Sequence, residues 1–559
     1  MRSKIFTFML AVLVLSVTAS AQKLSRQDEA MLLDFDRHMS SQFKSDGPGA
    51  AVLVAKNGNV IYKKAFGMAD LELNVAMQPD MIFRIGSITK QFTAVAILQL
   101  AEKGKLSIDD EITKYIDNYP TQGHKITIEH LLTHTSGIKS YTAMRIWDPA
   151  VRKRDMTPEA LIDFFKNEPM DFEPGTRFLY NNSGYILLGS IIEKVSGLSY
   201  ANYIAENIFK PAGMDHSSYD NTSKIIQNRA KGYQPGAGGV VNADYLSMTQ
   251  PYAAGSLIST VADLYKWNRA LHSYKLVGKQ YLDKAFASYR LADGKETDYG
   301  YGWTLGNIRG TSTIEHGGGI NGFLTHAIYL PDSDIFVAVF SNCNCNPPEA
   351  VTARLAATAL GNPYPEKEIP ADQAKMNDYT GVYLNSEGLE RQITIDGKSL
   401  YSQVKGSGRF RIIPYAPDKF MVENSQTLIH FERGAGGKIE SVISLGRAGK
   451  AVSWKPATQE ATPTHQKITV QTHILEQYAG EYELAPEFSL TITVVGNRIF
   501  AQGTGQGSNE IYPESETKFF LEIVDAQIEF IKDASGHYSK LILYQGGQKM
   551  EAKRKIDLL

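Results

Sequence analysis

The sequence is poor in cysteine, with only Cys343 and Cys345 in 559 residues. Because they lie two positions apart, they could form only a strained disulfide. A thiolate metal site would need further ligands, and the sequence does not offer an obvious set of them. We therefore interpret the pair as incidental to the fold and the function.

The chain also lacks any strong imbalance of charge. Its 58 Lys and Arg residues nearly balance 60 Asp and Glu residues, for a net charge of −2. This composition gives no electrostatic argument for binding nucleic acid or an anionic membrane. A chain of this length is too long for one ordinary hydrophobic core, so two to four domains are expected.

The longest apolar run is at the N-terminus. Arg2 and Lys4 precede the apolar residues 5–17, and Ala19-Ser20-Ala21 supplies the small residues that signal peptidases need. The pattern predicts a signal peptide over residues 1–21, with cleavage after Ala21 and a secreted or periplasmic protein. No later apolar run is long enough to span a bilayer, so no membrane span is expected after cleavage.

A Ser-x-x-Lys pair opens the segment with the clearest helical periodicity. Apolar residues recur at helical spacing after Ser87, which places Lys90 one turn later on the same face. A lysine desolvated against apolar neighbours can supply the neutral amine that makes a serine nucleophilic. Alternatively, Ser87 only caps the helix and Lys90 is a solvated charge. The spacing alone decides nothing, because it recurs at Ser41/Lys44, Ser136/Lys139, Ser402/Lys405 and Ser515/Lys518.

A second pair, Tyr180 and Asn182, lies in a predicted loop before an apolar helix over residues 186–195. A tyrosine beside a lysine can pass a proton, and an asparagine side chain can hold a substrate amide. The alternative is that both residues only cap the loop. This spacing also recurs, at Tyr200/Asn202, Tyr219/Asn221 and Tyr383/Asn385.

The third segment is His316 followed by three glycines, ahead of predicted strands over residues 323–329 and 335–341. Successive glycines let a ligand lie against the backbone of an edge strand, where a free N–H can donate to an oxyanion. The alternative is a flexible approach to a hairpin.

His130 and His134 are four residues apart, which is the spacing of two metal ligands on one helical face. The residues between them include no carboxylate, and no third ligand is evident. We therefore expect a buried, hydrogen-bonded histidine beside the site, with no metal and no cofactor.

Taken together, the three motifs occur in the order and approximate separations of the penicillin-recognising serine hydrolases, and the chain resembles that superfamily over most of residues 36–360. The resemblance implies an α/β catalytic domain of β-lactamase/transpeptidase-like type, with an antiparallel sheet flanked by helices. It also implies that Ser87 is acylated and that Lys90 and Tyr180 handle its proton. Asn182 would orient the substrate amide.

The resemblance further implies an oxyanion hole formed by the N–H groups of Ser87 and Gly319, next to His316 and Gly318. Many members have Lys-Thr-Gly as the third motif, and this chain has none. His316 supplies less fixed positive charge for a substrate carboxylate. His-x-Gly is instead similar to the D-aminopeptidase branch, so β-lactamase activity is not the expected one. His-Gly-Gly-Gly also occurs in α/β-hydrolase esterases, but the mature chain lacks their Gly-x-Ser-x-Gly elbow.

The C-terminal part contains a duplication. Tyr-x-Gly-x-Tyr occurs at Tyr379 and again at Tyr478, and the same offset of 99 residues relates Thr394 to Thr493 and Phe431 to Phe530. A constant register predicts two copies of one antiparallel β-module, each closed into a small barrel. The expected domains are a catalytic domain over 22–362 and barrel-like modules over 374–458 and 470–559.

The sequence therefore predicts a serine hydrolase of small peptides or amides with D-residues, such as cell-wall fragments. Two alternatives stay open, an esterase on the same scaffold and a catalytically silent wall-binding protein. No nucleic-acid partner is expected.

Overall fold

The computed structural model describes residues 25–236, 238–365, 368–423, 425–446, 451–457, 467–485, 488–504, 508–545 and 548–555. The predicted signal peptide lies outside these residues. Within them, every helix is too short or too polar to cross a bilayer.

The catalytic domain is built on a six-stranded antiparallel sheet in the order β10-β11-β12-β13-β1-β2. The central strands β1 and β13 are buried along almost their whole length, which matches their nearly continuous apolar sequences. Asn57 and Gly58 both adopt positive φ between β1 and β2, as the Asn-Gly pair predicts for a tight hairpin. The six strands are β1 (Ala50–Lys56), β2 (Asn59–Phe66), β10 (Thr304–Ile308), β11 (Thr311–Ile320), β12 (Phe323–Leu330) and β13 (Ile335–Ser341).

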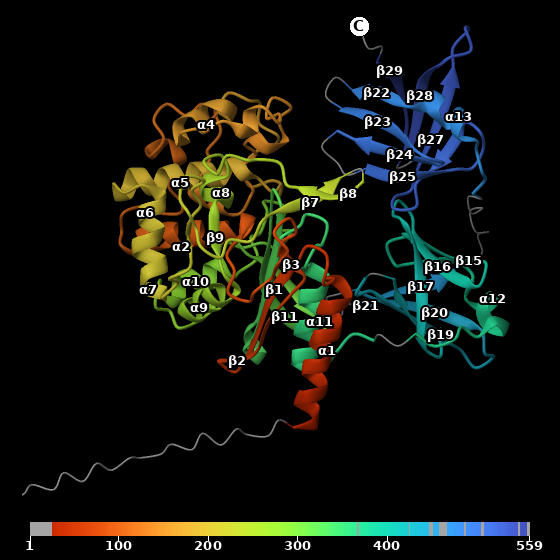
Figure 1. The fold of residues 1–559 in the computed structure, drawn as a ribbon, viewed down its shortest axis with the longest axis horizontal. Helices are drawn as coiled ribbons and strands as arrows, with labels where there is room; N and C mark the ends of the chain where they lie inside the picture. Colours follow the sequence, from red (N-terminus) through yellow and green to blue (C-terminus); the bar gives the residue numbers. More distant parts are fainter. Residues whose placement is uncertain are drawn as a thin grey trace, which may run out of the picture.

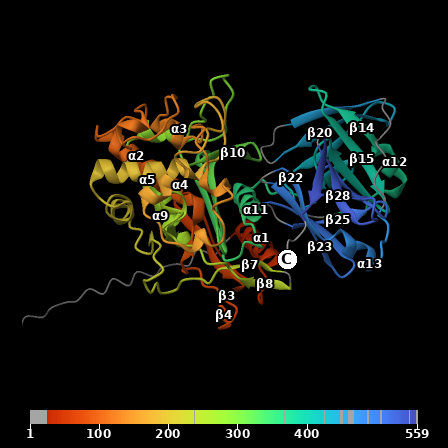
Figure 2. The same cartoon turned by 90° about the horizontal axis from the view of Figure 1, so that it is seen from above.

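Helices cover both faces of this sheet (Figures 1 and 2). On one face, α1 (Arg26–Gln42) and α11 (Glu349–Leu360) contribute Phe35, Met39 and Leu355 to a separate apolar core. The other face carries the larger core, to which α2, α5, α8 and α9 belong. The predicted arrangement of helices around an antiparallel sheet is confirmed.

The helices of the larger core are α2 (Thr89–Glu102), α3 (Ile128–Leu132), α4 (Pro158–Phe165), α5 (Asn182–Ser196), α6 (Tyr200–Ile204), α7 (Lys210–Ala212), α8 (Tyr252–Gly255), α9 (Val261–His272) and α10 (Lys279–Ala285). Short strands complete the domain: β3 (Met68–Asp70), β4 (Val75–Ala76), β5 (Phe83–Arg84), β6 (Ser218–Tyr219), β7 (Tyr233–Gly236), β8 (Gly239–Asn242) and β9 (Leu257–Ser259).

The glycines after His316 form the second half of β11. Strand β10 pairs with β11 only as far as Glu315, so among the described strands the glycine half has a neighbour on one side only, β12. The backbone of this half touches the turn that carries Ser87. A Cβ on Gly318 would lie 2.0 Å from the Ile85 carbonyl oxygen, and one on Gly86 would lie 2.9 Å from the Gly319 nitrogen. Only glycine permits this approach.

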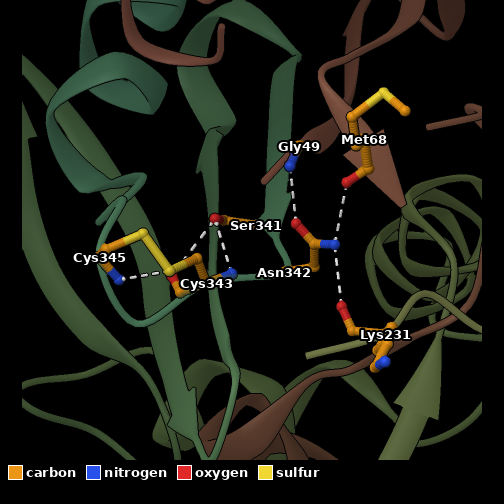
Figure 3. Close-up of a disulfide and its surroundings, with 7 residues drawn as sticks. All are labelled: Gly49, Met68, Lys231, Ser341, Asn342, Cys343 and Cys345. Carbon is orange, nitrogen blue, oxygen red and sulfur yellow. Dashed lines mark hydrogen bonds between the residues drawn. A yellow bond between two sulfur atoms is a disulfide. The ribbon is translucent and has the colours of Figure 1, made fainter. Parts of the chain in front are cut away.

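The two cysteines form a disulfide with each other just after β13 (Figure 3). The adjacent Asn342 is buried and joins three segments. Its Oδ1 accepts from the Gly49 N–H at 2.7 Å, and its Nδ2 donates to the carbonyl oxygens of Met68 at 3.1 Å and Lys231 at 2.9 Å. The disulfide therefore lies next to a side chain that ties β1 and β3 to a later loop.

The duplicated C-terminal part forms two closed barrels of eight antiparallel strands, β14–β21 and β22–β29, as predicted. Both lie on the side of the catalytic domain that carries α1 and α11 (Figures 1 and 2). We call them barrel 1 and barrel 2. The strands of barrel 1 are β14 (Gly381–Leu384), β15 (Glu390–Asp396), β16 (Ser399–Val404), β17 (Arg409–Ala416), β18 (Lys419–Val422), β19 (Leu428–Arg433), β20 (Ile439–Leu445) and β21 (Ala451–Pro456).

The strands of barrel 2 are β22 (Gly480–Ala485), β23 (Phe488–Val495), β24 (Arg498–Gly503), β25 (Ser508–Pro513), β26 (Lys518–Phe520), β27 (Ala526–Lys532), β28 (Tyr538–Gln545) and β29 (Gln548–Arg554). A helical turn precedes each barrel, α12 (Met376–Tyr379) and α13 (Thr472–Leu475).

The close approach of β11 to the Ser87 turn can be tested with two neighbouring substitutions. Gly318→Ala should destabilise the catalytic domain by about 1–3 kcal/mol, because its methyl group collides with backbone that cannot move aside. Gly319→Ala is the matched control, since its nearest neighbour is a Leu324 methyl at 3.4 Å. Urea denaturation followed by tryptophan fluorescence measures both. Equal stabilities of the two variants would contradict the packing described above.

Candidate active site

Ser87 and Lys90 lie on one continuous turn. Residues Gly86–Ile88 form a 3-10 turn that runs directly into α2, so the helix begins at Thr89, two residues after the serine. Lys90 Nζ lies 3.2 Å from Ser87 Oγ. The side chain of Lys90 is fully buried, which excludes the alternative of a solvated surface charge.

Lys90 contacts two further segments. Its Nζ lies 2.8 Å from Asn182 Oδ1 and 2.9 Å from the carbonyl oxygen of Ala254. The Tyr180 ring centroid is 4.8 Å away. Among the described residues, no carboxylate forms an ion pair with it. Burial without a counter-charge lowers the pKa of Lys90 well below the usual lysine value, which favours the neutral amine.

Tyr180 and Asn182 flank the start of α5. Asn181 caps this helix through the Gly184 N–H, so α5 begins earlier than the predicted residue 186. The interaction of the Tyr180 hydroxyl with the nearby Ser87 side chain lowers the Tyr180 pKa, but burial has the larger effect and raises it. The residue as a whole is 37% exposed, whereas its hydroxyl end is buried. The phenol therefore stays protonated at neutral pH.

Both ends of the Asn182 carboxamide have partners. Oδ1 faces Lys90, and Nδ2 donates to Thr142 Oγ1 at 3.0 Å. Thr142 lies in a short turn, Tyr141–Ala143, from a part of the chain that the sequence did not single out. The asparagine is thereby oriented beside the serine.

His316 belongs to a chain of hydrogen bonds with Tyr299 and His134. The Tyr299 hydroxyl lies 2.9 Å from His316 Nε2 and 3.2 Å from His134 Nε2. His134 Nδ1 accepts from the Asn181 N–H at 3.0 Å, so in the neutral ring Nε2 carries the proton and donates to Tyr299. The Tyr299 hydroxyl then donates to His316 Nε2, and His316 Nδ1–H donates to the Gly317 carbonyl oxygen at 2.5 Å.

Both histidines in this chain are neutral. Burial lowers the pKa of His316 to about 3, and repulsion by the protonated form of Lys90 is a smaller cause. The same two causes lower the pKa of His134 well below its usual value. The prediction of a buried, hydrogen-bonded histidine beside the site is confirmed for His134. His130 instead accepts the Thr127 N–H at the start of α3, and the described residues include no cluster of three metal ligands.

The sequence missed Tyr299, Thr142 and Ala254. Tyr299 lies in a loop before β10, without a recognisable motif around it. Ala254 contributes only its carbonyl oxygen, which any residue could supply. Long-range contacts of this kind leave no periodic signal in the sequence.

Comparisons with known proteins agree with this geometry. The family model described as Beta-lactamase matches residues 35–361, and one described as a domain of unknown function (DUF3471) matches residues 464–555. Penicillin-binding protein 4* of Bacillus subtilis (strain 168) is 30% identical over 428 residues, which are 71% of this chain and 94% of that protein.

Two solved structures extend the likeness. The octameric penicillin-binding protein homologue from Pyrococcus abyssi is 30% identical with a TM-score of 0.54, covering 76% of this chain and 99% of that one. The D-stereospecific amidohydrolase from Streptomyces sp. is 25% identical with a TM-score of 0.52, covering 58% and 98%. The family model spans more than half of the sequence, and the chain therefore belongs to the β-lactamase family of serine hydrolases.

Proposed function

We propose that this protein is a secreted amidase or peptidase that forms an acyl-enzyme on Ser87 and acts on small peptides or amides with D-residues. The observation that carries the substrate class is the neutral, buried His316 beside Ser87. Where many members carry a lysine in this motif, His316 supplies no fixed cation for a substrate carboxylate. Uncharged amides fit such a site better, and the relative from Streptomyces is named a D-stereospecific amidohydrolase.

The hydrogen bonds of Lys90 suit the role of resting base. A neutral amine has two N–H groups and one lone pair. The two N–H groups serve Asn182 Oδ1 and the Ala254 carbonyl, and the lone pair is left facing Ser87 Oγ. Ser87 can therefore give its proton to Lys90 as Oγ attacks the substrate carbonyl carbon.

The tetrahedral intermediate carries a negative oxygen that backbone N–H groups can stabilise. Ser87 and Gly319 are brought together by the glycine contact between β11 and the serine turn, so their N–H groups are the proposed donors. Breaking the C–N bond leaves an acyl group on Ser87, and the proton held by Lys90 passes to the leaving nitrogen, with Tyr180 as the carrier. A water molecule then attacks the ester carbonyl and gives one proton to Lys90. As the bond between the carbonyl carbon and Ser87 Oγ breaks, Lys90 returns that proton to Oγ, and the acid leaves.

An esterase on this scaffold is the second candidate, because the same acyl transfer works on esters. Alcohol leaving groups need less help from a proton donor than amines do. A catalytically silent wall-binding protein is the third candidate. Wall binding would not require a fully buried lysine next to a serine.

The first test is covalent labelling followed by turnover. A fluorophosphonate or penicillin should add one adduct to Ser87, detectable by mass spectrometry and absent in Ser87→Ala. D-alanine p-nitroanilide should then be hydrolysed with a higher kcat/KM than L-alanine p-nitroanilide. Faster turnover of p-nitrophenyl acetate than of either anilide would favour the esterase. No adduct on any residue would favour the binding protein.

Lys90→Arg should lower kcat by about 10²–10⁴-fold, because a guanidinium stays protonated and cannot accept the Ser87 proton. In the wild type, activity should be lost as the pH falls through the lowered pKa of Lys90, and the acid limb of the profile should lie far below pH 10. Lys194→Arg is the control, since Lys194 is exposed and pairs with Asp117. An acid limb near the ordinary lysine pKa would contradict Lys90 as the base.

Tyr299→Phe removes the hydroxyl between His134 and His316, so the orientation of His316 should be lost. We expect kcat to fall about 10- to 100-fold, the effect of one lost buried hydrogen bond. The ¹⁵N shift of His316 Nε2 should change with it. Tyr301→Phe is the matched control, because it removes a hydroxyl that contacts Glu129 rather than a histidine. An unchanged His316 shift in Tyr299→Phe would refute the positioning role.

A further inference from the structure

Barrel 1 has a cavity of about 630 Å³ at one end, outside the catalytic domain. Most of its lining residues belong to barrel 1, many of them to β15, β16 and β17, and Glu522 and Lys467 line it from outside barrel 1. Its lining combines cationic, hydroxyl and apolar groups with carboxylates. Among them are Arg391, Ser402, Phe410, Arg411 and Val422, and the carboxylates are those of Asp396, Glu423 and Glu522. An eight-stranded barrel has room either for its own side chains or for one small ligand.

Arg391 is the unusual residue of this lining. It alternates with Ile393 along β15, so it faces the barrel interior, and its side chain is only 7% exposed. One Nη donates to Ser402 Oγ at 2.7 Å, and the guanidinium lies 4.4 Å from the centroid of the Trp454 ring. Its Nε has no hydrogen-bond partner in the structure as described.

The charge of Arg391 is not neutralised by the part of the chain that the structure describes. Burial lowers its pKa to about 10, which still leaves it protonated at neutral pH. The other two arginines of the cavity each have a carboxylate. Arg409 pairs with Asp396 at 3.3 Å, and Arg411 pairs with Glu423 at 3.1 Å. A buried cation without a counter-ion destabilises a fold, so Arg391 requires another explanation.

Barrel 2 shows that the fold does not need a polar end. The strand registers of the two barrels superpose at the 99-residue offset: Arg391 faces Val404 as Leu490 faces Gly503, and Ile393 faces Ser402 as Ile492 faces Ala501. In the last strand of each barrel the offset is 98 residues: Trp454 faces Val442 as Ala552 faces Leu541.

The polar end of barrel 1 is therefore apolar in barrel 2. Arg391, Ser402 and Trp454 correspond to Leu490, Ala501 and Ala552, and all three counterparts are buried in the core of barrel 2. Ser444 accepts a hydrogen bond from the Trp454 indole N–H at 2.8 Å, and it corresponds to Leu543 at the offset of 99 residues. The duplicated fold tolerates leucine and alanine at these positions, so the arginine is not a requirement of barrel closure.

We propose that this cavity of barrel 1 binds a small amphipathic carboxylate, whose carboxylate pairs with Arg391 and whose apolar body lies against Phe410 and Val422. A carboxylate would supply the missing counter-charge and hydrogen-bond acceptor for the guanidinium. Phe410 lines the cavity and is 44% exposed, so its ring can pack against the apolar part of such a ligand. This binding is independent of the acyl chemistry at Ser87.

The test compares two probes that differ only in charge, dansylglycine and dansylglycinamide. Dansylglycine should bind the full chain with enhanced dansyl emission and energy transfer from Trp454. The amide should bind about 10- to 100-fold more weakly, as expected for the loss of a charge-assisted hydrogen bond. Arg391→Leu introduces the residue that barrel 2 has at the equivalent position. It should weaken the binding of dansylglycine by the same factor and leave the binding of dansylglycinamide unchanged.

Two controls keep the result interpretable. Arg391→Leu should melt no lower than the wild type, because it removes an unpaired buried charge. Arg391→Gln offers a second variant of similar size if the leucine protein does not fold. Arg498→Gln should not change binding, since Arg498 is an exposed arginine of barrel 2 that pairs with Glu510. Equal affinity for both probes, no binding of dansylglycine to the wild type, or full binding by both Arg391 variants would overturn the proposal.

Discussion

The active site depends on the burial of one amine. Lys90 touches the serine turn, the first residue of α5 and the carbonyl of α8, so a single side chain fixes three segments that are far apart in the sequence. Without solvent or a carboxylate, that amine is pushed towards its neutral form. The contacts of Lys90 with these segments and the lowering of its pKa therefore have the same cause, which is its burial in this part of the domain.

Sequence reasoning located the residues for which we propose chemical roles, but not those that hold them in place. Ser87, Lys90, Tyr180 and Asn182 stand in short motifs, and the structure brings all four together. Tyr299 lies outside any motif, because its contribution is a hydroxyl placed by tertiary packing between two histidines. Local patterns record spacing along the chain, whereas the orientation of His316 depends on residues more than a hundred positions apart.

The fold of the C-terminal part was predictable for a different reason. Residues that keep the constant offset, such as Tyr379 and Tyr478 or Gly397 and Gly496, are structural in both barrels: the tyrosines are buried and the glycines adopt positive φ. Their repetition therefore reveals the common architecture. The positions at which the copies differ, such as Arg391 against Leu490, gain meaning only when the registers show which side chains share the interior.

The unlike interiors of the two barrels also matter while the chain is folding. Tandem copies of one module can exchange equivalent strands, because the hydrogen-bonding pattern of each strand suits either partner. Here a hybrid barrel would place the guanidinium of Arg391 in the apolar interior of barrel 2, or put Ala552 in the space that Trp454 fills in barrel 1. Such mixed products are disfavoured, so the divergence of the two interiors helps each copy to close on its own strands.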